Sequence, residues 1–132
     1  MTITYEWRGD FDDEAVNALH EQSFEHPPEA IDWLARVHSH SLGWVCARLD
    51  RRLVGFLNVA WDGGIHAFLL DTMVAEGHRG SGIGTGLVTA AAEGARSAGC
   101  EWLHVDFESP LRAFYFDSCG FEPTDAGLLA LS

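Results

Sequence analysis

The chain has 132 residues, 47% of them hydrophobic, so one globular domain over residues 1–132 with a substantial core is expected. Its formal net charge of −12 at pH 7 argues against nucleic acid as a partner, because nucleic-acid binding needs basic patches. The acidity either attracts a cationic acceptor or only keeps the protein soluble. No apolar run reaches the roughly 18–20 residues that span a membrane, so no membrane association is expected.

The N-terminal segment and the cysteines indicate the cellular compartment in which the protein is expected. Residues 1–6 contain no basic region before an apolar stretch, so we predict no signal peptide. Cys46, Cys100 and Cys119 are odd in number and widely spaced, which favours free thiols in a reducing cytosol. They show no metal-like pairing, and no second cluster stands near the single group of His104, Asp106 and Glu108. A cytoplasmic protein without a bound metal is therefore expected.

The first half of the chain alternates between strand-like and helical patterns. Apolar residues alternate at the N-terminus, recur at helical spacing in the next segment, and alternate again after Gly43. Pro28 suits the first turn of a helix. The predicted elements are a strand Thr2–Trp7, a helix Asp12–Phe24, a second helix starting at Pro28, and two hairpin strands Trp44–Leu49 and Leu53–Trp61.

The second half begins with a strand, a long helix and another strand, which predicts a parallel pair with a right-handed crossover. The predicted elements are a strand Ile65–Val74, a helix Gly82–Ala98, a strand Trp102–Phe107, a helix Pro110–Asp117, a return strand from Gly120, and a short edge strand Leu128–Leu131. Alternation along the first of these strands puts residues 66, 68, 70, 72 and 74 on one face. Asp71 is then expected on the opposite face.

Residues 74–86 (VAEGHRGSGIGTG) form a glycine-rich turn between a predicted strand and a predicted helix. Glycine allows backbone N–H groups to approach a ligand closely, and a helix start offers unpaired N–H donors with a positive dipole end. Arg79 adds a charge that can pair with a phosphate. The turn therefore predicts a ligand with a phosphate or pyrophosphate group, the alternative being a helix start that binds nothing.

Two common phosphate motifs do not fit this turn. The spacing G-x-G-x-x-G fails from Gly80 and from Gly82, and a triphosphate-binding loop needs a lysine, which the chain lacks. The pattern that fits is Arg-x-x-Gly-x-Gly, formed by Arg79, Gly82 and Gly84. It resembles the acetyl-coenzyme A (acetyl-CoA) loop of the GNAT superfamily of N-acetyltransferases.

A second motif supports the same resemblance. Residues 103–107 (LHVDF) and 113–121 (AFYFDSCGF) are similar to the closing GNAT motif of a strand, a helical Ala-x-x-Phe/Leu-Tyr and Gly-Phe. Both motifs stand in the superfamily's order. The resemblance implies an α+β fold of three layers, the GNAT-like acyl-CoA N-acyltransferase fold. Its sheet would be mixed and mostly antiparallel, with six or seven strands flanked by about four helices.

The resemblance also implies an acetyl-CoA site at the glycine-rich turn. Backbone groups at the end of the preceding strand would hold the pantetheine arm and polarise the thioester carbonyl, and the turn would cradle the pyrophosphate. Leu70 and Thr72 would line the acetyl end. The implied cofactor-binding residues are Met73, Val74, Ala75, Arg79, Gly80, Ser81, Gly82, Ile83, Gly84, Thr85, Phe107 and Phe116.

The proton-transfer residues are less defined. The superfamily's tyrosine, which can protonate the leaving thiolate, usually stands four residues before the glycine of Gly-Phe. Here Phe116 holds that position and Tyr115 lies five residues before. Either a one-residue insertion late in the helix shifts the count, or Tyr115 is a packed aromatic whose phenol points elsewhere. His66 is a candidate base or an ordinary histidine after a turn, and His104 is a candidate proton relay.

The resemblance implies acetyl transfer from acetyl-CoA, by direct attack, to a primary amine of a small molecule or peptide. The alternative from another class is a noncatalytic acyl-CoA-binding sensor or interaction domain with the same fold. Transfer of a longer acyl group is a third hypothesis. Because many members of the superfamily pair as dimers, a homodimer through Leu128–Leu131 is also among the expectations.

Overall fold

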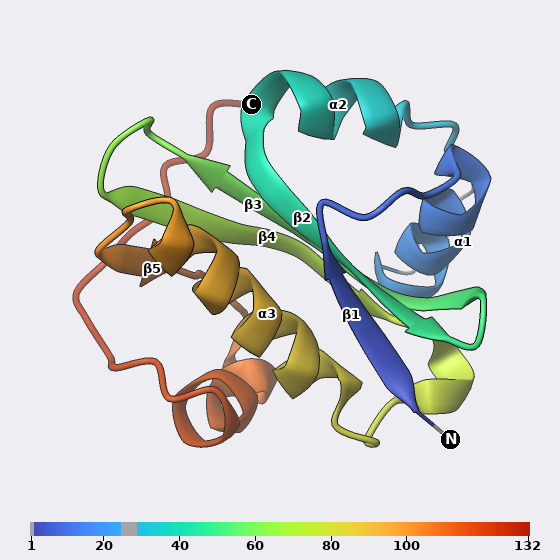
Figure 1. Ribbon diagram of the computed structural model, residues 1–132. Helices are drawn as coiled ribbons and strands as arrows, with labels where there is room; N and C mark the ends of the chain where they lie inside the picture. Colours follow the sequence, from blue (N-terminus) through green and yellow to red (C-terminus); the bar gives the residue numbers. More distant parts are fainter. Residues whose placement is uncertain (1, 25–28) are drawn as a thin grey trace.

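The sheet runs in chain order through the molecule, with each strand beside the next (Figure 1). The computed structural model describes residues 2–24 and 29–132. The strands are β1 (Ile3–Trp7), β2 (Ser41–Leu49), β3 (Arg52–Trp61), β4 (His66–Val74) and β5 (Trp102–His104). The first four pair antiparallel and β5 joins β4 in parallel, which confirms a mixed, mostly antiparallel sheet.

Helices cover both faces of this sheet (Figure 1). They are α1 (Asp13–Phe24), α2 (Trp33–His40) and α3 (Ile83–Ser97), with the short turns η1 (Glu76–His78), η2 (Ser109–Leu111) and η3 (Phe114–Ser118). Helix α3 makes the crossover between the parallel strands, as expected. In the part of the chain that the structure describes, none of the helices has the length and apolar character needed to cross a bilayer.

The two sheet faces carry separate cores. On one face α3 packs on β2, β3 and β4 through Leu57, Leu69 and Leu87, each at most 3% exposed. On the other face α1 and α2 pack through Val16 and Trp33 on the opposite side chains of β2, β3 and β4. We call these the α3 face and the α1/α2 face.

The C-terminal elements differ from expectation. The predicted strand Trp102–Phe107 ends at His104, and among the described residues no strand forms at Gly120 or at Leu128–Leu131, so the sheet has five strands rather than six or seven. Leu128, Leu129 and Leu131 are 83–91% exposed. A strand is stable only when it pairs and buries one face, and this segment does neither.

Two helices also differ from the prediction, one in its helix type and one in the residue at which it begins. The predicted helix Pro110–Asp117 forms as one continuous helical segment over residues 109–118, which begins with the 3-10 turn η2 and ends with the π-helical turn η3. The predicted start of the second helix, Pro28, lies outside the described residues. Helix α2 begins instead at Trp33, where the Asp32 carboxylate caps it by accepting from the Ala35 N–H at 3.0 Å.

Strand β4 carries one extra residue near its end. Phe56 of β3 opposes Met73 and Asn58 opposes Leu70, so a β-bulge lies between them, with Asp71 at φ 57°. A one-residue shift reverses the faces of all following side chains. Leu69 therefore packs in the α3 core and Met73 in the α1/α2 core.

The bulge corrects the expected alternation. Residues 66, 68 and 70 lie on the α1/α2 face, whereas Thr72 and Val74 lie on the α3 face. The prediction that all five share one face is wrong. Asp71 accepts a hydrogen bond from Asn58, whose neighbours Leu57 and Val59 face α3, so Asp71 lies on the α1/α2 face with Leu70 rather than opposite it.

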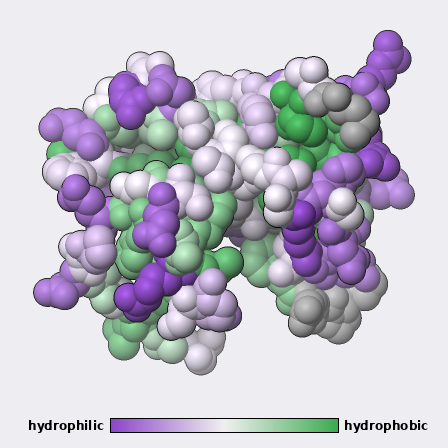
Figure 2. Space-filling model, turned by 90° about the horizontal axis from the view of Figure 1, so that it is seen from below, coloured by the Kyte–Doolittle hydropathy of each residue, from purple (hydrophilic) through white to green (hydrophobic). Residues whose placement is uncertain are grey.

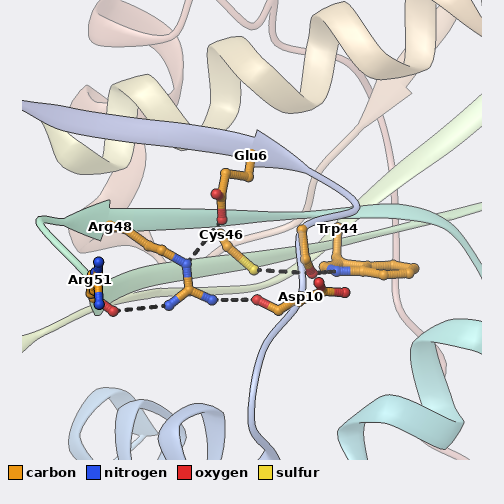
Figure 3. A network of polar contacts seen from close by, with 7 residues as sticks. Glu6, Asp10, Trp44, Cys46, Arg48 and Arg51 are labelled. Atoms are coloured by element: carbon orange, nitrogen blue, oxygen red, sulfur yellow. Dashed lines mark hydrogen bonds and ion pairs between the residues drawn. The ribbon is translucent and has the colours of Figure 1, made fainter.

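Arg48 joins the first strands to the loop after β1 (Figure 3). Its Nε donates to Glu6 of β1 at 3.0 Å, and its two terminal nitrogens donate to the carbonyls of Arg51 and Asp10. Beside it Trp44 Nε1 donates to the Gly9 carbonyl at 2.8 Å. These contacts satisfy loop carbonyls that cannot join the sheet.

Helix α3 approaches β1 through its glycines. A Cβ at Gly86 would lie 2.2 Å from the Tyr5 ring, and one at Gly94 would lie 2.4 Å from the Trp7 ring. Trp7 is held from its other side by Gly43, where a Cβ would also lie 2.2 Å from the ring. The indole therefore fills the space between α3 and β2 and has no room to move aside.

Gly94→Ala should lower the free energy of unfolding by about 1–3 kcal/mol, because the methyl group overpacks the Trp7 ring. The gain in helix propensity, about 1 kcal/mol, offsets only part of this cost. Urea denaturation followed by Trp fluorescence measures the change. Gly77→Ala is the control, since its Cβ meets nothing within 4 Å. Equal or greater stability of Gly94→Ala would contradict the packing.

The three thiols should differ in reactivity. Burial raises the pKa of all three thiols, to about 12 for Cys46, but Cys100 and Cys119 are only half-buried and accessible to a reagent. Since the thiolate is the reactive form, two thiols should react quickly with an aromatic disulfide at pH 8, and the third only after unfolding. Cys46→Ala should keep two fast thiols. Three fast thiols in the native wild type would refute the buried position of Cys46.

Candidate active site

Strands β4 and β5 pair over only three residues each, His66–Phe68 with Trp102–His104. Beyond them β4 continues to Val74 without a strand on that side, so the parallel pair opens. Val74 and Gly55 oppose each other, and the next residue, Ala75, donates to the Val54 carbonyl at 2.8 Å. The alternation of an antiparallel ladder then turns the Val74 N–H away from β3, toward the opening.

The loop after β4 and the η3 turn lie at one end of the molecule (Figure 1). Figure 2 views the molecule from that end and shows a hollow at its lower margin, bordered by hydrophobic side chains. The open end of the β4–β5 pair and the glycine-rich turn therefore lie on the same side of the protein.

Each residue of the Arg-x-x-Gly-x-Gly pattern has a structural role. Arg79 folds back, and its guanidinium donates to the carbonyls of Val74 at 3.3 Å and Gln22 at 3.2 Å. Gly82 is the N-cap of α3 at φ 87°. Gly84 allows close packing, because a Cβ there would lie 3.0 Å from the Phe114 ring. Arg79 thus closes the turn rather than extending from it.

The turn keeps donors available. The N-cap of α3 supplies no side-chain hydrogen bond, and the first helical backbone bond is made by Gly86, to Gly82. The N–H groups of Ile83, Gly84 and Thr85 are therefore free of backbone partners at the positive end of the helix. A Cβ at Gly80 or Gly82 would meet nothing within 4 Å, so the space before them is open. These features fit a pyrophosphate.

Gln22, at the end of α1, is a part of this loop that the sequence analysis missed. Its side-chain oxygen accepts from the Glu76 N–H at 3.1 Å, and its carbonyl accepts from Arg79. No sequence signal marks it, because it lies 54 residues before Glu76 on another element.

The Tyr115 side chain points into the α3 core, although Tyr115 lies one residue before the superfamily's usual tyrosine position. The η3 turn is π-helical, and the Cys119 N–H donates to the Phe114 carbonyl five residues before it, at 3.0 Å. A π-helical turn holds one more residue than an α-helical turn, and such turns are frequent at functional sites. The extra residue is thus accommodated within the turn, and the role of Tyr115 as the acid stays a prediction. Tyr115 is 6% exposed and lies in the α3 core.

The phenol of Tyr115 is protonated at neutral pH. Burial raises its pKa above the usual 10, and the nearby Thr72 hydroxyl opposes part of this rise. Thr72 Oγ1 is itself buried and makes no hydrogen bond of good geometry. A buried polar atom without a partner is costly. The Thr72 hydroxyl, next to Tyr115, therefore has hydrogen-bonding capacity left.

The two predicted phenylalanines lie next to Tyr115. The Phe107 ring stacks on Tyr115 at a centroid distance of 4.7 Å, and Phe116 meets Phe107 edge-on at 5.2 Å. Arg112 lies over the Phe116 ring at 5.8 Å. Phe116 is thus packed on the side of Phe107 rather than in the core position that Tyr115 takes.

The predicted histidines form a separate pair. His66 Nδ1 lies 2.8 Å from His104 Nε2, and His104 stacks on Phe68 at 4.7 Å. Both belong to the paired part of the strands. Six residues of strand separate His66 from Thr72, about 20 Å at the usual rise. The structure therefore does not bring His66 together with Tyr115. In residues 2–24 and 29–132, no group of three or more His, Cys, Asp or Glu could hold a metal ion.

Solved structures share this architecture. An acetyltransferase of the GNAT family from Streptococcus pneumoniae TIGR4 is 22% identical, with a TM-score of 0.78 over 99% of this chain and 98% of that one. A putative acetyltransferase from Agrobacterium tumefaciens C58 is 18% identical, with a TM-score of 0.83 over 98% and 99%. The aminoglycoside N-acetyltransferase AAC(6')-Iy, in complex with CoA, is 18% identical, with a TM-score of 0.79 over 99% and 95%.

At these identities the likeness shows a common fold. No curated protein matches the chain in sequence. The family model of the acetyltransferase (GNAT) family matches residues 4–121, which include the opening of the sheet, the glycine-rich turn and Tyr115. The chain therefore belongs to the acetyltransferase (GNAT) family.

Proposed function

We propose that the protein transfers an acetyl group from acetyl-CoA to a primary amine by direct attack of the amine on the thioester. The observation that carries this proposal is the opening between β4 and β5, with free helix-start N–H groups at one end and the buried Thr72–Tyr115 pair beside it. The neighbour AAC(6')-Iy, crystallised with CoA, has the same fold and supports the choice of cofactor.

The chain's own residues supply three functions. The N–H groups of Ile83, Gly84 and Thr85, with the helix dipole, hold the pyrophosphate. The Val74 N–H faces the opening and polarises the acyl carbonyl. The neutral amine attacks the acyl carbon and its surplus proton passes to water, while Tyr115, protonated at neutral pH, donates a proton at the sulfur atom as the C–S bond breaks. The bound acetyl-CoA supplies the activated acyl group.

The alternative is a noncatalytic acyl-CoA-binding domain. The folded-back Arg79 and the deep burial of Tyr115 fit such a domain as well, since both stabilise the fold. Release of free thiol from acetyl-CoA in the presence of any amine distinguishes the two functions, because a noncatalytic domain binds the cofactor without turnover.

Arg79→Ala should weaken acetyl-CoA binding by about 1.5–3 kcal/mol, the scale of hydrogen bonds to a charged group. The loss includes the charge near the pyrophosphate and the tie to the Val74 carbonyl. Calorimetric titration measures it. Arg96→Ala, at the other end of α3 and paired with Glu93, is the control and should bind normally. No binding by the wild type up to millimolar acetyl-CoA would refute the cofactor assignment.

Tyr115→Phe should lower turnover by roughly 10²-fold or more, the usual range for a general acid, with acetyl-CoA affinity nearly unchanged. Thiol release and calorimetry measure the two quantities. The double variant Tyr115→Phe/Phe116→Tyr moves the phenol to the superfamily's usual position and should not restore turnover, because Phe116 packs on another side of Phe107. Full activity of Tyr115→Phe would remove Tyr115 as the acid.

A further inference from the structure

An exposed apolar strip lies on the α1/α2 face of β4. Helices α1 and α2 cover β2, β3 and Met73 on this face but leave Phe68 and Leu70 each 39% exposed. His104 stacks on Phe68 with an interplanar angle of 19° and extends the strip to β5. We call Phe68, Leu70 and His104 the shelf. It ends at the bulge, where Asp71 follows Leu70.

The Asp71 carboxylate is held by a chain of buried polar groups. Asn58, only 4% exposed, donates through Nδ2 to Asp71 Oδ2 at 3.2 Å. Its Oδ1 accepts from the Ser41 hydroxyl at 2.5 Å. A carboxylate can only accept, so it fixes the orientation of the Asn58 amide and makes Ser41 the donor. Asn58 is the one buried polar residue among the described core residues, and both ends of its amide serve this chain.

Asp71 has no cation of its own. The ion pairs among the described residues are Arg48–Glu6 and Arg96–Glu93, and the one hydrogen bond to the Asp71 carboxylate leaves Oδ1 free. Its backbone has φ 57°, a conformation that costs energy for a residue other than glycine and that the surrounding structure must hold in place. A positioned carboxylate without a partner, beside an apolar strip, is complementary to an ammonium group with an apolar substituent.

The same face offers little to an anionic acceptor. The arginines that contact its core, Arg8 and Arg36, lie over the rings of Trp44 and Trp33 at 5.2 and 4.9 Å. The chain has no lysine. A phosphate or carboxylate on the acceptor would be repelled by the net charge of −12.

We infer that Asp71, held by Asn58 and Ser41, binds the ammonium group of an arylalkylamine or alkylamine acceptor whose apolar part lies on the shelf, and that this group loses a proton to water before it attacks the thioester. This inference rests on the proposed function, because it places the acceptor next to the β4–β5 opening. Phe68 lies about 7 Å along the strand from Leu70, so a two- or three-carbon link between amine and ring suits the distance.

The test compares 2-phenylethylamine with glucosamine 6-phosphate as acceptors for the wild type and for Asp71→Asn. With 2-phenylethylamine, Asp71→Asn should raise KM roughly 10- to 100-fold, change kcat less, and leave acetyl-CoA affinity unchanged. Asp50→Asn is the matched control, since Asp50 is also an aspartate at φ 57° but lies exposed in the β2–β3 turn. Its KM should equal that of the wild type.

A second variant tests the polar chain. Ser41→Ala removes the donor to Asn58 and should raise KM for 2-phenylethylamine several-fold, with the melting temperature reporting any loss of fold. Calorimetry of 2-phenylethylamine alone with the wild type and Asp71→Asn gives a readout independent of turnover. Tighter binding to the wild type supports the inference.

Failure of the proposed function and failure of this inference give different results. If acetyl-CoA binds and amines are acetylated, but Asp71→Asn has an unchanged KM, the inference is overturned while the proposed function stands. Preference of the wild type for glucosamine 6-phosphate would likewise overturn the acceptor class. If acetyl-CoA does not bind at all, the proposed function fails and the inference fails with it.

Discussion

The extra residue in β4 at Asp71 sets the chemistry of both faces of the sheet. In a regular strand, Leu70, Thr72 and Val74 would share a face and Asp71 would point opposite them. The bulge turns Leu70 and Asp71 to the α1/α2 face and Thr72 to the α3 face, within three consecutive residues. A carboxylate and the Thr72–Tyr115 pair thus lie on opposite sides of one short stretch of backbone, where β4 has lost its parallel partner.

The surrounding structure holds this stretch in place. Asn58 ties the bulge to β3 and, through Ser41, to the start of β2, while Arg79 and Gln22 tie the end of β4 to the turn and to α1. On the α3 face, the π-helical turn η3 places Tyr115 in the α3 core, and Gly84 allows α3 to pack closely against Phe114. A strained backbone, a buried amide and a π-helical turn each cost stability, and all three lie around the opening.

Much of the fold and of the glycine-rich turn could be predicted from local patterns. The positions of β1 to β4, the helical spacing of α1 and α3 and the glycine-rich turn depend on neighbouring residues, so they can be predicted without the fold. The two motifs were sufficient to indicate the GNAT family. The last strands could not be predicted in the same way, because Leu128–Leu131 looks strand-like but buries nothing. The histidine prediction depended on residue type and on an expected strand register, and in the structure His66 lies about 17 Å of strand away from the bulge at Asp71.

The sequence by itself determined the family, the order of the main elements and the position of the glycine-rich turn, because these depend on spacings of a few residues. The tertiary structure alone decided which side chains face the opening. A bulge leaves no local signature in a strand, yet it reverses the face of every residue after it. The contacts of Gln22 with Glu76 and of Asn58 with Asp71 join residues 54 and 13 positions apart, and only the folded chain brings such pairs together.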